Sequence, residues 1–127
     1  MTKAYTPLEP ARRPGGKPSR HPTYRILVHR KYADAWSQIV SRVGLQQAQQ
    51  FWDHVASNPG GPTALASTTF LKGKAGKPKL QGFSRMIHYE VSSMARINYQ
   101  YCDEYQTSST GDKHPVVFIW TIDYSSH

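Results

Sequence analysis

The sequence has one cysteine, no long apolar run, and half as many acidic residues as basic ones. Cys102 alone excludes a disulfide framework and cannot build a zinc site. Scarce cysteine also fits a reducing compartment. No stretch approaches the length of a membrane span, and no apolar segment of a secretory signal follows the basic N-terminus. We therefore expect a cytoplasmic protein with no membrane partner, no metal and no cofactor.

Acidic residues number 8 against 16 Lys and Arg, which gives a formal net charge of +8. The excess is concentrated in two segments. Residues 1–31 carry eight basic side chains against Glu9, and residues 70–96 carry six against Glu90. Solubility alone explains a charge of this size. The clustering instead favours a polyanionic partner, because each phosphate neutralised by a cation releases a condensed counterion.

A chain of 127 residues has the length of one domain with a modest core. Residues 1–22 contain five prolines and a Gly-Gly pair, and Tyr5 and Leu8 are their only sizeable apolar side chains. Such a segment buries too little apolar surface to offset the entropy of ordering it. The sequence predicts a basic, flexible, Pro/Gly-rich arm at 1–22 and a folded domain at 23–127.

Two apolar stripes with helical spacing follow a short strand at residues 24–29. The first stripe runs over 32–43 and stops at Gly44. The second runs over 45–56 and stops at the turn-forming residues 58–62. Because almost no loop separates them, the two helices must pack as an antiparallel hairpin.

Alternating apolar residues predict strands at 83–91 and 96–101, after a mostly irregular stretch at 63–82. Residues 116–122 are apolar on both faces, which is typical of a central strand. The predicted fold class is α+β: an N-terminal strand, an antiparallel two-helix hairpin, and an antiparallel meander of three or four strands. The helices should cover one sheet face and leave the other polar and basic. Several aromatic residues are expected in the core: Trp36, Phe51, Trp52, Phe118 and Trp120.

Three stretches, in this order and spacing, resemble the RelE/ParE superfamily of toxins from toxin–antitoxin pairs. Residues 70–73 (Phe-Leu-Lys-Gly) are similar to the Leu-Lys/Arg-Gly step that follows the helical hairpin in that family. Residues 95–101 are similar to its Tyr-Arg-Leu-Val-Tyr-type strand, and 116–124 to its last apolar strand. The resemblance covers residues 24–127 by pattern more than by identity.

The resemblance implies a RelE-like toxin of a type II toxin–antitoxin system, held inactive by a cognate antitoxin protein. Many RelE-type members cleave messenger RNA in the ribosomal decoding site, so the first hypothesis is a ribosome-dependent, metal-independent mRNA endonuclease that blocks translation. Two alternatives stay open. One is a ParE-type inhibitor of DNA gyrase without nuclease activity, and the other is a non-catalytic basic protein that binds RNA or the ribosome.

Metal-free RNA cleavage needs a base for the 2′-hydroxyl, a cation for the charge on the phosphorane, and an acid for the leaving oxygen. Arg96 matches the family's strand arginine that stabilises the scissile phosphate, and its planar guanidinium suits that role. Arg85 approximately matches a basic residue of the preceding strand. It lies in phase with Phe83 and Ile87, where a charge needs a partner or an open cleft.

The acid–base candidates are His88, Tyr124 and His127. The last two resemble, loosely, a histidine or tyrosine near the C-terminus of some family members. A rim of lysines is expected to bind RNA phosphates: Lys72, Lys74, Lys77 and Lys79. Each of these residues also fits an ordinary solvated surface. The family's additional arginine after the final strand has no match here, and Asp123 adds negative charge there, so weak or absent nuclease activity is also consistent with the sequence.

Overall fold

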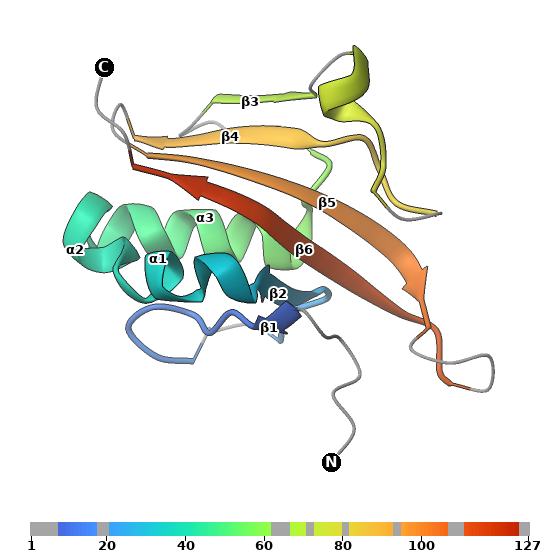
Figure 1. Ribbon diagram of the computed structural model, residues 1–127. Coiled ribbons are helices and arrows are strands. Elements are labelled where there is room, and N and C mark those ends of the chain that lie inside the picture. Colours follow the sequence, from blue (N-terminus) through green and yellow to red (C-terminus); the bar gives the residue numbers. More distant parts are fainter. Residues whose placement is uncertain are drawn as a thin grey trace.

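The computed structural model describes residues 8–17, 21–61, 67–70, 73–79, 82–92, 95–106 and 111–124. They form a mixed α+β structure in which the helices lie together on one side of a single sheet (Figure 1). The strands are β1 (Leu8–Pro10), β2 (Arg25–His29), β3 (Ser67–Phe70), β4 (Ile87–Ser92), β5 (Ala95–Tyr105) and β6 (His114–Asp123). The helices are α1 (Ala33–Ser37), α2 (Ile39–Val43) and α3 (Leu45–Ser57), with 3-10 turns η1 (Arg30–Tyr32) and η2 (Gly73–Gly76).

The six strands are ordered β1-β2-β6-β5-β4-β3. Strands β3 to β6 are consecutive antiparallel neighbours, while β2 runs parallel to β6 and β1 runs antiparallel to β2. The predicted α+β class, the strand at 24–29 and the antiparallel meander are confirmed, whereas the helical segment forms three helices in place of the predicted two. Strand β6 lies between β2 and β5, and its residues 116–119 are buried, as expected for a strand that is apolar on both faces.

The helical segment differs from its prediction in one detail. The first helix is divided at Gln38, where ψ is near 2° and the chain leaves the α-helical region between α1 and α2. Gly44 ends α2 with a φ of +91°, a conformation that side chains with a Cβ rarely adopt. Helix α3 then packs its apolar stripe on the sheet, where the Phe51 ring lies 4.9 Å from Tyr89 and 6.0 Å from Tyr99.

Residues 8–17, which we call the strap, differ from the flexible arm expected for 1–22. Strand β1 pairs with β2, and Ala11 is buried with its N–H bonded to the Ile26 carbonyl at 2.9 Å. Two indoles hold the strap on the helices. Trp52 donates to the Ala11 carbonyl at 2.8 Å, and Trp36 donates to the Arg12 carbonyl at 3.1 Å. The strap is ordered mainly through its backbone, which is why its composition did not predict this.

Side chains add a second set of strap contacts. The Arg13 guanidinium donates to both carboxylate oxygens of Asp53, at 2.8 and 3.0 Å, and this bonding raises the pKa of Arg13. The Gln49 amide donates to the Pro14 carbonyl at 2.9 Å. The strap is therefore fixed to α3 at several points along its length.

The sheet face away from the helices, which we call the open face, is not uniformly polar. A small apolar cluster lies at one end of it, made of Leu8, Leu27, Phe83, Cys102, Val116 and Phe118. The expectation of a fully polar and basic face was therefore wrong at that end. The strap and the segment before β4 each bring an apolar side chain there, which covers the open side of β2 and β6.

Candidate nucleic-acid interface

Arg96 lies on the open face between two acidic residues. In the sheet register it is opposite Glu90 of β4 on one side and Asp123 of β6 on the other. Residues directly opposite each other in neighbouring strands point to the same face, with Cβ atoms roughly 5 Å apart. Arg96 is half-buried. The predicted phosphate-binding guanidinium thus stands on the predicted face, but in a row that also carries two carboxylates.

His88 lies in the next row of the open face. It is opposite Asn98, and its Nδ1 is 2.8 Å from the Asn98 Oδ1. An amide oxygen only accepts hydrogen bonds, so Nδ1 is the donor in this contact, and in the neutral ring the lone pair is then on Nε2. Because Arg96 is two residues before Asn98 on β5, His88 and Arg96 are diagonal neighbours, and the structure brings these two predicted residues together.

Gln100 is fully buried and connects the lysine-rich loop to the sheet. Its amide nitrogen donates to the Lys77 carbonyl at 3.1 Å, and its Oε1 accepts from the Lys79 N–H at 3.2 Å. The same oxygen accepts from the Trp120 indole at 2.9 Å. One buried carboxamide therefore holds the backbone of both lysines against the open face, beside an aromatic ring.

Trp120 was expected in the core, but it is half-buried on the open face. It alternates with Val116 and Phe118, so it lies on the same face as these residues and packs against their apolar cluster without being fully covered. Tyr99 is opposite Ile119 and Asn98 is opposite Thr121, so Trp120 is an extra residue at a β-bulge. Strict alternation does not show where such an insertion occurs. After the bulge the side chains change phase, which returns Ile122 to the core beneath the helices.

The four lysines predicted to bind RNA differ in where the structure places them. Lys77 and Lys79 are exposed, and the Lys79 ammonium lies over the Trp120 ring at 5.6 Å from its centroid. Lys74 is exposed in η2, immediately before this loop. Lys72 lies outside the described residues. The structure thus shows two of the four lysines anchored at the open face through their backbone.

Arg85 and Tyr124 do not join the row of Arg96. Arg85 is exposed in the segment before β4, because the strand begins at Ile87 and not at residue 83. The Tyr124 hydroxyl donates to the Ala35 carbonyl at 2.5 Å, and the ring packs with the core on the helical side. Burial raises the pKa of Tyr124 to about 12, so its phenol stays protonated at neutral pH. The other C-terminal candidate, His127, lies outside the described residues.

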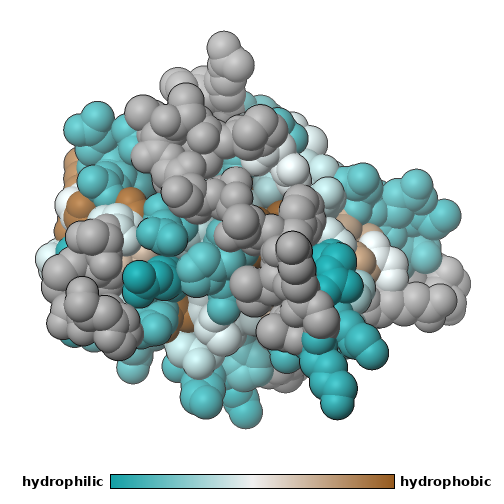
Figure 2. Space-filling model, turned by 90° about the horizontal axis from the view of Figure 1, so that it is seen from above, coloured by the Kyte–Doolittle hydropathy of each residue, from teal (hydrophilic) through white to brown (hydrophobic). Residues whose placement is uncertain are grey.

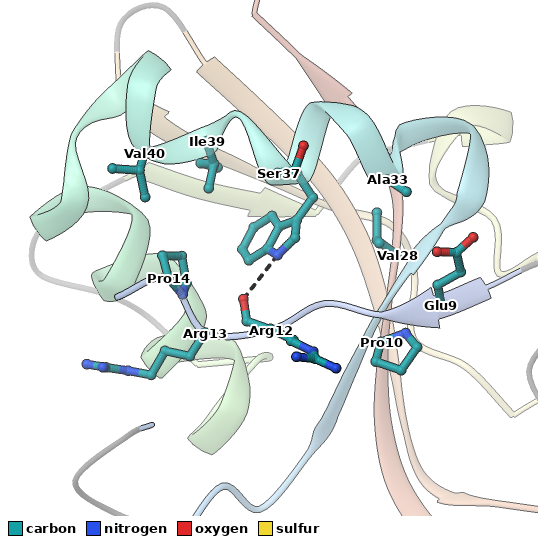
Figure 3. Close-up of a pocket in the computed structure, with 11 residues that line it drawn as sticks. Glu9, Pro10, Arg12, Arg13, Pro14, Val28, Ala33, Ser37, Ile39 and Val40 are labelled. Carbon is teal, nitrogen blue, oxygen red and sulfur yellow. Dashed lines mark hydrogen bonds between the residues drawn. The ribbon is translucent and has the colours of Figure 1, made fainter. Parts of the chain in front are cut away.

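A cavity of about 380 Å³ lies between the strap and helices α1 and α2 (Figure 3). Its walls are mostly apolar, with Val28 of β2, Trp36 of α1 and Ile39 of α2 facing the strap. Arg12 and Glu9 bring charge to the strap side. Among the described residues, none of those predicted to bind or cleave RNA lines this cavity, so it is separate from the open-face site.

Hydrophilic residues cover most of the described surface in the view of Figure 2, and apolar colour appears only in small separate patches. Within the described ranges, no group of three His, Cys, Asp or Glu side chains is arranged to hold a metal ion. Among the helices described above, none has the length and apolar character needed to cross a membrane.

Sequence reasoning missed three features of this site. Gln100 looked like an ordinary outward-facing strand residue, and no local pattern marks the loop that it holds. Trp120 was assigned to the core because an apolar run does not show which of its side chains the rest of the molecule covers. The third feature is the Glu90 carboxylate beside Arg96, which follows from the register of β4 and β5. Because the two residues lie on adjacent predicted strands, sequence analysis could have tested this pairing.

The fold and the site define a basic α+β domain whose open sheet face combines lysines, a half-exposed tryptophan and a His–Arg pair. Comparison with known proteins found no matching family model, no similar curated protein and no similar solved structure.

Proposed function

We propose that this chain acts on RNA through its open face, as a toxin of the RelE/ParE kind that blocks translation at the ribosome in the cytoplasm, with a cognate antitoxin as its partner. One observation carries the RNA-directed part of the proposal: buried Gln100 fixes Lys77 and Lys79 over the same face that holds Arg96. Lysines whose backbone is held beside an aromatic ring, on the same face as an arginine, suit a phosphate backbone with unpaired bases. The toxin part rests on the resemblance described above.

Cleavage of the bound RNA is the first hypothesis for how it acts. His88 and Arg96 are diagonal neighbours, and Nε2 of the neutral His88 ring accepts the 2′-hydroxyl proton. The resulting alkoxide attacks the adjacent phosphorus to form a 2′,3′-cyclic phosphate, the bond to the 5′-oxygen breaks, and that oxygen takes a proton from a water molecule. The Arg96 guanidinium stabilises the extra charge on the phosphorane.

A non-catalytic alternative is favoured by the acidic residues beside Arg96. Glu90 and Asp123 flank the guanidinium in the register and lower the positive potential where a phosphate would bind. Binding by Lys77 and Lys79 does not depend on that row. In this case the chain binds messenger RNA or the ribosome and blocks translation without cutting.

Binding is tested with a fluorescent single-stranded RNA and anisotropy measurements. The double variant Lys77→Ala/Lys79→Ala should lose at least about tenfold in affinity, since each phosphate contact removed also removes counterion release. Lys113→Ala is the matched control, because Lys113 is an exposed lysine whose ammonium lies 3.4 Å from Glu104 in another part of the chain. Equal losses in both variants would reject the open face as the RNA surface.

Cleavage and toxicity are tested by inducing the chain in bacteria and following growth, translation and transcript integrity together. The nuclease hypothesis requires transcripts to be cut, and Arg96→Ala and His88→Gln to abolish cutting while thermal unfolding stays unchanged. Arrest with intact transcripts and inhibited supercoiling would instead support a gyrase inhibitor. Arrest with intact transcripts, normal supercoiling and lysine-dependent RNA binding would support the non-catalytic alternative.

A further inference from the structure

Trp120 is unlike the other two tryptophans of this chain. Trp36 and Trp52 are 8% and 7% exposed, and both donate their indole N–H to carbonyls of the strap. Trp120 is half-buried, and its position in phase with Val116 and Phe118 puts it on the open face, at a β-bulge. Bulges are common beside functional sites. Part of the Trp120 side chain packs against the apolar cluster of the open face, and the rest is left in water beside Lys79.

The Trp120 ring is held in place at its edge. Its N–H is bonded to buried Gln100 at 2.9 Å, and the ring meets Phe118 edge to face at 6.0 Å. The His29 ring lies 6.1 Å away on β2. Over the ring lies the ammonium of Lys79, which belongs to an exposed side chain. The ring is therefore fixed, whereas the group above it is free to be displaced.

We infer that Trp120 is a stacking platform for an unpaired RNA base, and that Lys79 moves from the ring to the adjoining phosphate when the base arrives. This inference rests on the proposed RNA binding and names its substrate class, single-stranded RNA. Every base has a flat π-face, so stacking is tolerant of sequence. In a duplex the bases are already stacked on one another and are not offered to a side chain.

Gln100 makes this arrangement available before RNA binds. The same carboxamide holds the Trp120 indole and the backbone of Lys77 and Lys79. The distance between the aromatic platform and the lysines that contact phosphate is thereby set in the free protein. Less conformational entropy is then lost on binding, which favours affinity.

Tryptophan fluorescence of the full chain tests the inference directly. A short oligouridylate should quench the emission, because it stacks on the half-exposed indole, while the same strand annealed to oligoadenylate, or heparin as a charge-only probe, should not. Trp120→Phe should abolish the quenching, since Trp36 and Trp52 are buried. Quenching that persists in Trp120→Phe, or that is equal for single strand, duplex and heparin, would overturn the inference.

Affinity for labelled oligouridylate gives an independent test. Trp120→Leu should weaken binding about tenfold, the loss expected for one stacked base, and Trp120→Phe should recover most of it. Tyr32→Leu is the matched control: Lys31 lies over the Tyr32 ring at 5.8 Å, a similar lysine–aromatic pair that packs against the core on the helical side. Its affinity should be unchanged.

The outcomes separate this inference from the proposal beneath it. If wild-type protein binds RNA in a lysine-dependent way but Trp120→Leu binds equally well, the stacking platform is rejected and RNA binding stands. If wild-type protein binds no RNA, both are rejected. Should Trp120→Leu fail to fold, the fluorescence of wild type and Trp120→Phe with single and double strands still decides.

Discussion

Gln100 shows how one side chain couples stability to a surface loop. A carboxamide removed from water costs free energy unless its polar atoms are bonded. Gln100 satisfies this requirement with three bonds, two to the loop backbone and one to an indole. The stability of the sheet and the position of Lys77 and Lys79 therefore depend on the same group.

Replacing Gln100 should change both the stability of the sheet and the binding of RNA by the loop. Gln100→Leu keeps the approximate volume but leaves the three partners without their bonds, so the free energy of unfolding should fall by about 1–3 kcal/mol. RNA affinity should fall as well, because the loop is released. Urea denaturation and anisotropy measure the two effects. Gln46→Leu, at an exposed position on α3, is the control and should change stability by less than about 0.5 kcal/mol.

His54 predicts a pH dependence. Its Nε2 is buried in α3 without a hydrogen-bond partner, and burial lowers the pKa of the imidazole from its ordinary value of 6.5. The unfolded chain then binds this proton more readily than the folded one, so acid favours unfolding. The free energy of unfolding should carry no penalty from His54 above pH 6.5, and it should fall as the pH drops below that value. Thermal unfolding between pH 8 and 5 measures this, and His54→Leu should flatten the slope; an unchanged slope would contradict the prediction.

At the scale of elements, the strap is the main departure from what the sequence predicts. Helical periodicity located α3 within a residue, because one apolar face packs on the sheet. The strap has no such periodicity, and its order comes from carbonyls that accept bonds from Trp36 and Trp52, more than 20 residues away in the chain. Contacts of this kind are not encoded in local composition. The bulge at Trp120 escaped prediction for a similar reason, since the partner strand defines it.

Removing residues 1–14 tests the strap as a structural element. The deletion leaves the indole N–H groups of Trp36 and Trp52 without their acceptors and exposes the outer edge of β2. Each lost bond should cost about 1–3 kcal/mol, so the melting temperature should fall by more than 10 °C, at roughly 4–8 °C per kcal/mol. Arg13→Ala removes only a partly exposed ion pair and should cost less than about 1 kcal/mol. A deleted chain as stable as the full one would show that the strap contributes nothing.

At the scale of the whole molecule, the sequence predicted the face on which Arg96 lies but not the groups that surround it there. The sequence placed Arg96 on the face away from the helices, and the structure agrees. It could not place Asp123 beside that arginine, because their pairing depends on the register across the bulge. The sequence also could not show that Tyr124, the residue after Asp123, packs on the helical side and away from Arg96.

Binding of the whole molecule to single-stranded RNA should depend steeply on salt. The slope of log K against log salt is about −0.7 per phosphate neutralised on a single strand. Lys77→Ala/Lys79→Ala should therefore make the slope shallower by about 1.4, while Trp120→Leu should lower affinity at every salt concentration without changing the slope. Anisotropy between 50 and 300 mM KCl distinguishes the two. A slope unaffected by the lysine substitutions would remove them from the interface.

The central place of β6 has a consequence for the synthesis of the protein. Strand β6 follows every other described element in the chain, yet it lies in the middle of the sheet between β2 and β5. A nascent chain therefore lacks the strand that joins its two halves until about residue 123 has left the exit tunnel. The sheet is therefore completed only after β6 has been synthesised, because the pairing of β2 with β6 spans most of the chain. Any product of early termination will lack the middle of its sheet and will be a substrate for proteolysis.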